Sequence, residues 1–190
     1  MRTSILASAS AFLIASSVSF AAPITRTYDF TVINVRDQSG NNVPAPVNPV
    51  VGSITITYDP GLGTINNQTT GITVHSLNVP VASPIAFSYS AANTDEIQIG
   101  GLDQGTNSLT DGVADFLLDI FDASGPTPFF GNMDYTVQAT TISTGQFSDF
   151  AADTRADGTV TVVATGVPEP LSIAVLGVGL LGVIGVQRKR

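Results

Sequence analysis

The chain lacks cysteine and tryptophan altogether, and it has one histidine and one lysine in 190 residues. Without cysteine it cannot have a disulfide framework, a cysteine-based zinc site or a cysteine nucleophile. A lone histidine excludes a metal site made of histidines only. The chain has 7 basic against 15 acidic residues, and its pI is about 4.2. We therefore expect no nucleic-acid partner, because phosphate contacts require clustered Lys and Arg.

The N-terminus has the pattern of a secretory signal peptide. Ile5–Val18 is rich in apolar and small residues, and the small residues Ser19 and Ala21 follow it at positions −3 and −1 of a cleavage site. We predict a signal helix over residues 1–21, which signal peptidase removes after Ala21. The alternative is an uncleaved N-terminal anchor.

The C-terminus has the pattern of a membrane segment. Leu171–Val186 contains no charged residue, and Arg188, Lys189 and Arg190 end the chain. As a helix, these 16 residues span about 24 Å, somewhat less than the roughly 30 Å of a bilayer core. We predict a transmembrane helix over residues 171–186, with the basic stop-transfer residues in the cytoplasm and the main domain outside. The alternative is a buried helix followed by a solvated tail, but the segment has no polar face.

A short proline motif precedes this apolar segment, formed by Val167, Pro168, Glu169 and Pro170. The motif, the Gly-rich apolar segment and the terminal basic cluster together resemble the PEP-CTERM sorting signal of exported proteins of Gram-negative bacteria. The resemblance covers residues 167–190. It implies that an integral-membrane exosortase recognises and processes the motif, whose residues would be substrate and not catalyst. It also implies a final location in the cell envelope or extracellular matrix, with exopolysaccharide as a possible partner.

The remaining residues, 22–166, form the predicted exported domain. They contain 3 Arg against 13 Asp and 1 Glu, and they are rich in Thr, Asn and Gly. This composition favours strands and turns over helices. Apolar and polar residues alternate in several short runs between turn signals. The clearest of these are residues 28–32, 53–58, 85–90, 134–140 and 159–162, and residues 72–77 and 96–99 are weaker. We predict an all-β fold, an antiparallel and jelly-roll-like β-sandwich.

Three further segments complete the expected fold. Residues 39–49 and 100–112 are polar and are predicted to be loops. Val113–Phe121 fits an amphipathic helix or a buried strand, and the all-β surroundings favour the strand. This segment and the residues after it also resemble, loosely, a Phe-x-Leu-x-Ile-Phe-Asp-x-Ser-Gly stretch of other exported PEP-CTERM proteins.

The sequence offers little for catalysis. His75 is the only imidazole, and it lies in a predicted strand without the Gly-x-Ser-x-Gly motif of a nucleophile elbow. Glu96 is the only Glu of the domain, which argues against a pair of glycosidase carboxylates. We therefore expect no enzyme and no catalytic residue. The alternative is a small hydrolase or calcium-dependent lyase that would need His75, or paired Asp residues with shifted pKa values, in a cleft.

The sequence does not identify a ligand site either. We expect no cofactor, with calcium as the alternative near Asp103–Asn107, Asp111, or Asp153 with Asp157. A carbohydrate-binding module would need an exposed aromatic platform. Tryptophan is absent, and the tyrosines fall mostly on inward strand faces: Tyr28, Tyr58, Tyr89 and Tyr135. The sequence therefore predicts an exported structural or adhesive protein, with the enzyme and the carbohydrate-binding module as alternatives.

Overall fold

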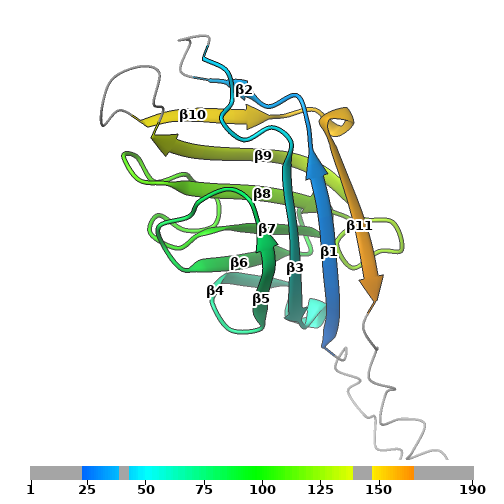
Figure 1. Ribbon diagram of the computed structural model, residues 1–190. Coiled ribbons are helices and arrows are strands. Elements are labelled where there is room, and N and C mark those ends of the chain that lie inside the picture. The colour runs from blue at the N-terminus through cyan, green and yellow to red at the C-terminus, as the bar shows by residue number, and fades with distance from the viewer. Residues whose placement is uncertain (1–22, 39–42, 139–146, 165–190) are drawn as a thin grey trace, which may run out of the picture.

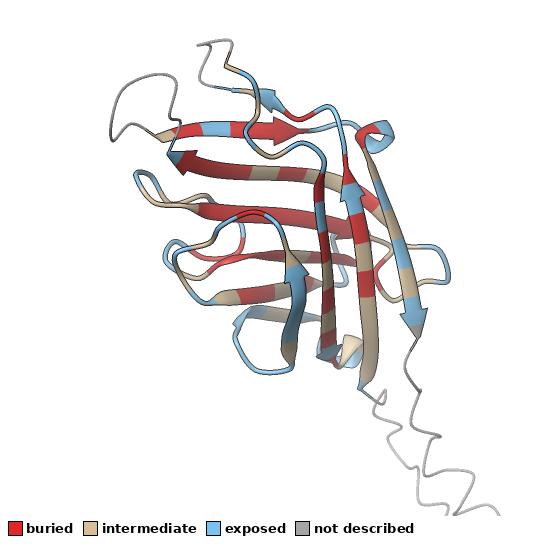
Figure 2. Cartoon of the chain, in the orientation of Figure 1, coloured by how far each residue is buried: buried red, intermediate tan, exposed pale blue. Residues whose placement is uncertain are grey.

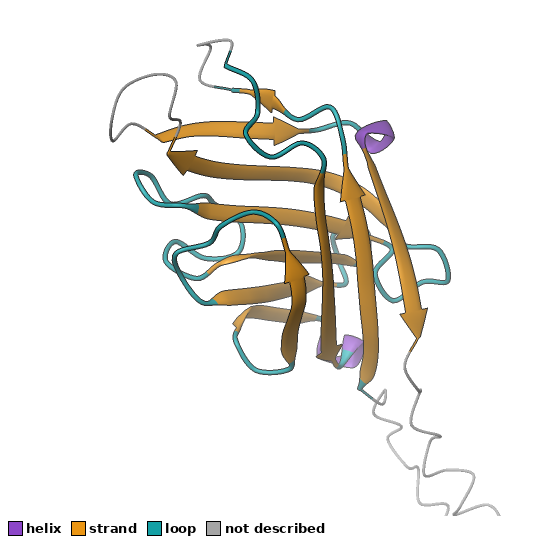
Figure 3. Ribbon diagram, viewed as in Figure 1, coloured by secondary structure: helices purple, strands orange, loops and turns teal. Residues whose placement is uncertain are grey.

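The protein folds into two packed antiparallel sheets (Figure 1). The computed structural model describes residues 23–38, 43–138 and 147–164. The elements are β1 Ile24–Val32, β2 Arg36–Asp37, β3 Val50–Tyr58, the 3₁₀ turn η1 Pro60–Leu62, β4 Thr64–Gln68, β5 Ile72–Leu77, β6 Ile85–Ser90, β7 Glu96–Gly101, β8 Asp115–Phe121, β9 Phe129–Gln138, β10 Phe147–Ala152, η2 Arg155–Asp157 and β11 Gly158–Ala164. Apart from the two short turns, the regular structure of the described residues consists of strands (Figure 3).

One sheet has four strands, in the order β11-β1-β3-β5, and the other has seven, in the order β2-β10-β9-β8-β7-β6-β4. The strands of the four-stranded sheet run steeply across those of the seven-stranded sheet (Figure 1). All pairings within both sheets are antiparallel. The prediction of an all-β, sandwich-like antiparallel domain is confirmed.

Alternation of side chains explains why these segments form strands. In β3, Ile54, Ile56 and Tyr58 are buried, whereas the intervening residues are half-buried or exposed. Figure 2 shows the same banding along β1 and β3. Such a period of two places every second side chain on the core face of a sheet.

The ambiguous segment is a strand. β8 occupies the middle of the seven-stranded sheet, between β7 and β9, and all its residues except Phe121 are buried. A central strand in which nearly every side chain is buried shows no simple alternation of buried and exposed residues, which is why its sequence also fits a helix. The predicted loop over residues 100–112 is shorter than expected, because Gly100 and Gly101 complete β7.

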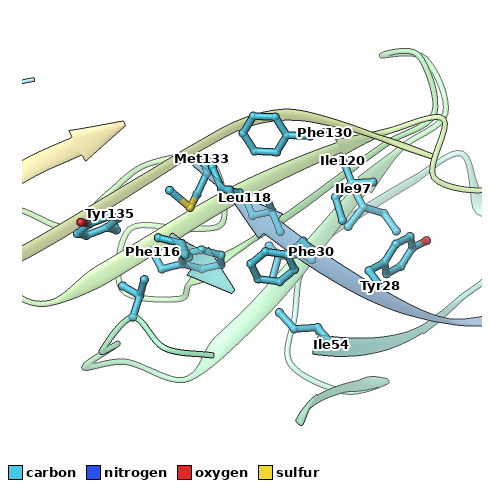
Figure 4. Close-up of a cluster of buried hydrophobic side chains, with 14 of the residues drawn as sticks. Tyr28, Phe30, Ile54, Ile97, Phe116, Leu118, Ile120, Phe130, Met133 and Tyr135 are labelled. Carbon is cyan, nitrogen blue, oxygen red and sulfur yellow. The ribbon is translucent and has the colours of Figure 1, made fainter. Parts of the chain in front are cut away.

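The core lies between the two sheets and contains large aromatic side chains (Figure 4). Phe30 of β1 stacks on Phe116 of β8, with ring centroids 6.1 Å apart. All four tyrosines are buried, as their inward strand positions predicted. Gly158 makes room for Phe130, because a Cβ at Gly158 would lie 2.2 Å from the Phe130 ring.

Candidate functional site

His75 does not form a catalytic triad with its described neighbours. It lies exposed on β5, where its Nε2 is 2.7 Å from Oγ1 of Thr55, and Thr55 Oγ1 is 2.7 Å from Oγ1 of Thr27. Neither a serine nor a carboxylate is among its hydrogen-bond partners in the described part of the chain. His75 thus joins a surface row of hydroxyl groups on the four-stranded sheet.

The tyrosines do not form a sugar-binding platform. The Tyr28 hydroxyl donates to the carbonyl of Ala123 at 3.0 Å, and the Tyr135 hydroxyl donates to the carbonyl of Val47 at 2.9 Å. Burial raises the pKa of Tyr28 to about 12, and it raises the pKa values of Tyr58, Tyr89 and Tyr135 as well. These rings stabilise the core and the loops beside it.

Of the aspartates considered for calcium, Asp157 has structural contacts, whereas Asp103, Asp111 and Asp153 are exposed. Asp157 accepts hydrogen bonds from Asn34 at 2.8 Å and from Thr154 at 2.5 Å, and these bonds, Thr154 first, lower its pKa. Thr106, within the Asp103–Asn107 segment, donates its backbone N–H to Asn67 Oδ1 at 3.0 Å. Among the described residues, no group of three or more His, Cys, Asp or Glu side chains is placed to hold a metal ion.

A polar row crosses the outer face of the seven-stranded sheet, and sequence reasoning did not find it. Gln98 of β7 pairs with Asp119 of β8. On the other side of Asp119 the β8–β9 register shifts, since Leu118 pairs with Met133 but Ile120 pairs with Phe130. This irregularity places Asn132 of β9 beside Asp119. The row therefore has a carboxyl group between two amides.

Two more carboxyl groups flank this arrangement. Gln98 Nε2 donates to Glu96 Oε1 at 3.1 Å, and Asn132 Nδ2 donates to Asp134 Oδ2 at 3.3 Å. Both amides also lower the pKa of Asp119, although burial outweighs their effect. We call these five residues, Glu96, Gln98, Asp119, Asn132 and Asp134, the carboxylate–amide row.

The row brings three carboxyl groups together on a largely buried part of the sheet surface. Asp119 is only 7% exposed, and its Oδ1 is buried without a hydrogen-bond partner among the described residues. Burial, followed by the charges of Glu96 and Asp134, raises the pKa of Asp119 to about 7. Burial is also the largest cause of the raised pKa values of Glu96 and Asp134. None of the groups that shift these three pKa values is basic.

An open pocket of about 240 Å³ adjoins the row. Its walls come from β4, β6, β7 and the turn between β6 and β7, and they consist of hydroxyl, amide and carboxyl groups with one tyrosine: Thr64, Asn66, Ser88, Tyr89, Ser90, Asn93, Glu96 and Gln98. We call it the Glu96 pocket. Thr106 Oγ1 donates to Ser88 Oγ at 2.6 Å, so a hydrogen bond from the loop after β7 stabilises the β6 side of the pocket. Glu96 and Gln98 belong to both the pocket and the row, which makes them one continuous site.

This site carried a weak signal in the sequence. Glu96, Gln98, Asp119 and Asp134 occupy outward positions of strands, where polar residues are ordinary in an antiparallel sheet. Glu96 alone stood out, as the only Glu in an Asp-rich domain. Their assembly into one site depends on strand order and on the register shift in β8–β9.

Comparison with known proteins gives no relative. No family model matches the chain, no curated protein matches it, and no solved structure matches it.

The predicted processing and sorting residues lie outside the described residues. They are the signal peptidase site at Ser19 and Ala21, the motif Val167, Pro168, Glu169 and Pro170, and the basic residues Arg188, Lys189 and Arg190. Within the described residues, no helix is long and apolar enough to cross a membrane. The predicted membrane helix over 171–186 is not among them.

Proposed function

We propose that this chain is an exported cell-envelope or extracellular-matrix protein with an adhesive role, and that the Glu96 pocket and the carboxylate–amide row bind a hydroxyl-rich polymer such as an exopolysaccharide. The observation that carries the proposal is the lining of the pocket, which consists almost wholly of hydroxyl, amide and carboxyl groups. Every sugar hydroxyl both donates and accepts, and these side chains offer both functions.

The size and chemistry of the site agree with a single sugar ring of a longer chain. A volume of about 240 Å³ is below the roughly 300–1,000 Å³ of pockets for drug-sized ligands. With the four tyrosines buried, hydrogen bonds and not ring stacking would supply the affinity. Weak binding at each sugar suits an adhesive protein, because several copies on one polymer add avidity.

The rest of the proposal concerns how the protein reaches its place. It rests on the signal peptide over 1–21 and the PEP-CTERM-like segment over 167–190. Signal peptidase and an exosortase would process the two ends, and the membrane helix would hold the precursor with its jelly-roll-like sandwich outside the cytoplasm. Mass spectrometry of the mature protein should find Ala22 as the first residue and the tail beyond Pro170 absent or altered. An intact Arg190 in the extracellular fraction would contradict processing.

Filling the pocket tests the adhesive role directly. Ser90 lines the pocket, and Ser90→Tyr would occupy its space without a change of charge. The full chain in detergent is incubated with the exopolysaccharide of the producing cells, and the bound fraction is measured by co-sedimentation. Ser90→Tyr should lose binding. Thr161→Tyr, on an exposed position of β11 in the other sheet, is the matched control and should retain it. Equal binding by the two variants would exclude the pocket.

One observation favours a second candidate, a glycoside hydrolase. Burial raises the pKa of Asp119, next to Gln98 of the pocket lining, to about 7, so that part of it is protonated at neutral pH, which is the state that a general acid requires. The protein would then release new reducing ends from the polysaccharide to which it binds, and Asp119→Asn would abolish the release. Binding without any release of reducing ends would leave the adhesive role alone.

A further inference from the structure

We infer that the Glu96 pocket selects a ligand that carries a protonated amine on a hydroxyl-bearing ring, that is, a de-N-acetylated amino sugar. This inference rests on the proposed function and names its ligand class. It starts from the imbalance of charge at the site. Glu96 lines the pocket, and Asp119 and Asp134 follow it across the next two strands.

No described basic group compensates these carboxyl groups in the contacts that the structure shows. Gln98 donates to Glu96 and Asn132 donates to Asp134, and the groups that lower the pKa values of the three carboxyl groups are the neutral amides of Gln98, Asn132 and Asn93. The guanidinium of Arg155 is engaged elsewhere, 3.7 Å from the centre of the Phe129 ring. A cation in the pocket would therefore relieve repulsion that the protein itself leaves in place.

Asp119, on the strand next to Glu96 and outside the pocket lining, is another carboxyl group without a positive partner among the described residues. Its Oδ1 atom has lost contact with water and has no donor among the described residues. A buried acceptor left without a donor destabilises the fold, and the cost is larger when the acceptor is charged. A positive group at Glu96, on the neighbouring strand, would stabilise the ionised form of Asp119 through space even without touching it.

The walls of the pocket distinguish between kinds of cation. An aliphatic polyamine or a lysine side chain needs apolar surface along its methylene groups, and the lining contains no Leu, Ile, Val or Met. A metal ion needs several converging charged ligands, whereas an ammonium group is satisfied by one carboxylate and neutral acceptors. Amides and hydroxyls around Glu96 match the ring hydroxyls of an amino sugar.

The test compares three disaccharides with the same β-1,4 linkage: the glucosamine disaccharide, its fully N-acetylated form and cellobiose. The full chain in detergent is titrated with each one by calorimetry at neutral pH. We expect the glucosamine form to bind at least tenfold more tightly than both neutral forms. This comparison needs no variant, so it stands even if a substitution at the buried Glu96 prevents folding.

Two variants separate a specific site from general attraction to an acidic protein. Glu96→Gln should reduce the preference for the amine to less than about threefold while weak binding of the neutral sugars persists. Asp103→Asn removes the same charge from an exposed loop position and should leave the preference unchanged. Equal loss in both variants would overturn the inference, because it would show non-specific charge attraction.

The outcomes distinguish this inference from the proposed function. Comparable binding of all three disaccharides overturns the amine preference and leaves a general sugar site. Binding of none of them, together with no binding of the exopolysaccharide, removes the proposed function itself. Binding that requires added Ca²⁺ and disappears with a chelator overturns the amine inference, because the carboxyl groups would then serve a metal.

Discussion

The guanidinium Nη2 of Arg26 donates to the backbone carbonyl of Ser124 at 2.5 Å. Nη1 of the same side chain donates to the carbonyls of Ala123 and Gly125, both at 2.6 Å. The first strand of one sheet thus holds the turn that follows the central strand of the other. The contact satisfies three backbone oxygens of the turn after β8, one of which, that of Ala123, also accepts from the Tyr28 hydroxyl.

Removal of this guanidinium should destabilise the domain. Arg26→Ala leaves the carbonyls of Ser124 and Gly125 without their side-chain donor and leaves Ala123 with the Tyr28 hydroxyl alone. We expect the free energy of unfolding to fall by about 2–4 kcal/mol. Arg26→Lys should recover part of the loss, because an ammonium can reach one or two of the oxygens. Urea unfolding of the full chain measures the effect. Arg155→Ala is the control, and it loses only a cation–π contact of about 0.5–1 kcal/mol. If Arg155→Ala lowered the free energy of unfolding as much as Arg26→Ala does, the special role of Arg26 would be contradicted.

The packing at Gly158 gives a second prediction about stability. Gly158 has an ordinary extended backbone, with φ −134°, so alanine is excluded only by the Phe130 ring. Gly158→Ala should cost about 1–3 kcal/mol through overpacking. Phe130→Leu in the same chain should recover part of that cost, and the double-mutant cycle should show favourable coupling. Strictly additive effects of the two substitutions would show that the ring does not limit this position.

Local sequence predicted β3 and the other strands with a clear apolar pattern, and among the strands of five residues or more it missed β4 and β10. Ile54, Ile56 and Tyr58 made β3 evident. β4 was missed because it is a polar edge strand with adjacent Asn residues, a residue type that is depleted in strands. β10 was missed because its buried face includes Ser148 and its last two alanines are both buried.

The candidate site was beyond local prediction for a different reason. Asp119 and Asp134 looked like ordinary solubilising acids of an antiparallel sheet. Burial is the first cause of their raised pKa values, and carboxyl groups from other parts of the sheet add to it. Both the burial of Asp119 and its neighbours depend on the order β7-β8-β9 and on the shift of register near Asp119. Such long-range pairing leaves no mark on the spacing of residues within either strand.

The basic tail gives a prediction that concerns topology. If Arg188, Lys189 and Arg190 stop the transfer of the apolar segment through the membrane, their deletion should release precursor from the membrane into the periplasm or the medium. Cell fractionation and immunoblotting measure the change. Replacement of the three residues by lysines keeps the charge and should keep retention. Retention of the deleted form would contradict the predicted stop-transfer role.

The raised pKa of Asp119 should make stability depend on pH in a defined direction. Its pKa rises from an ordinary 3.8 to about 7 on folding. Between these values the folded chain holds a proton that the unfolded chain has released. The contribution of Asp119 to the free energy of unfolding is therefore fully present below about pH 4, and it is lost as the pH rises through 7. Its size is on the order of 4 kcal/mol, since one pKa unit corresponds to about 1.36 kcal/mol.

Comparison of the wild-type chain with Asp119→Asn isolates this effect from other carboxyl groups. Glu96 and Asp134 also have raised pKa values and act in the same direction, whereas Asp157 has a lowered pKa and acts in the opposite one. Urea unfolding at pH 5 and pH 8 should therefore show a smaller loss of stability with rising pH in Asp119→Asn than in the wild-type chain. Asp103→Asn, on an exposed loop, should retain the wild-type dependence. If Asp119→Asn also retained it, Asp119 would be ionised at neutral pH, and a general-acid role for it would be excluded.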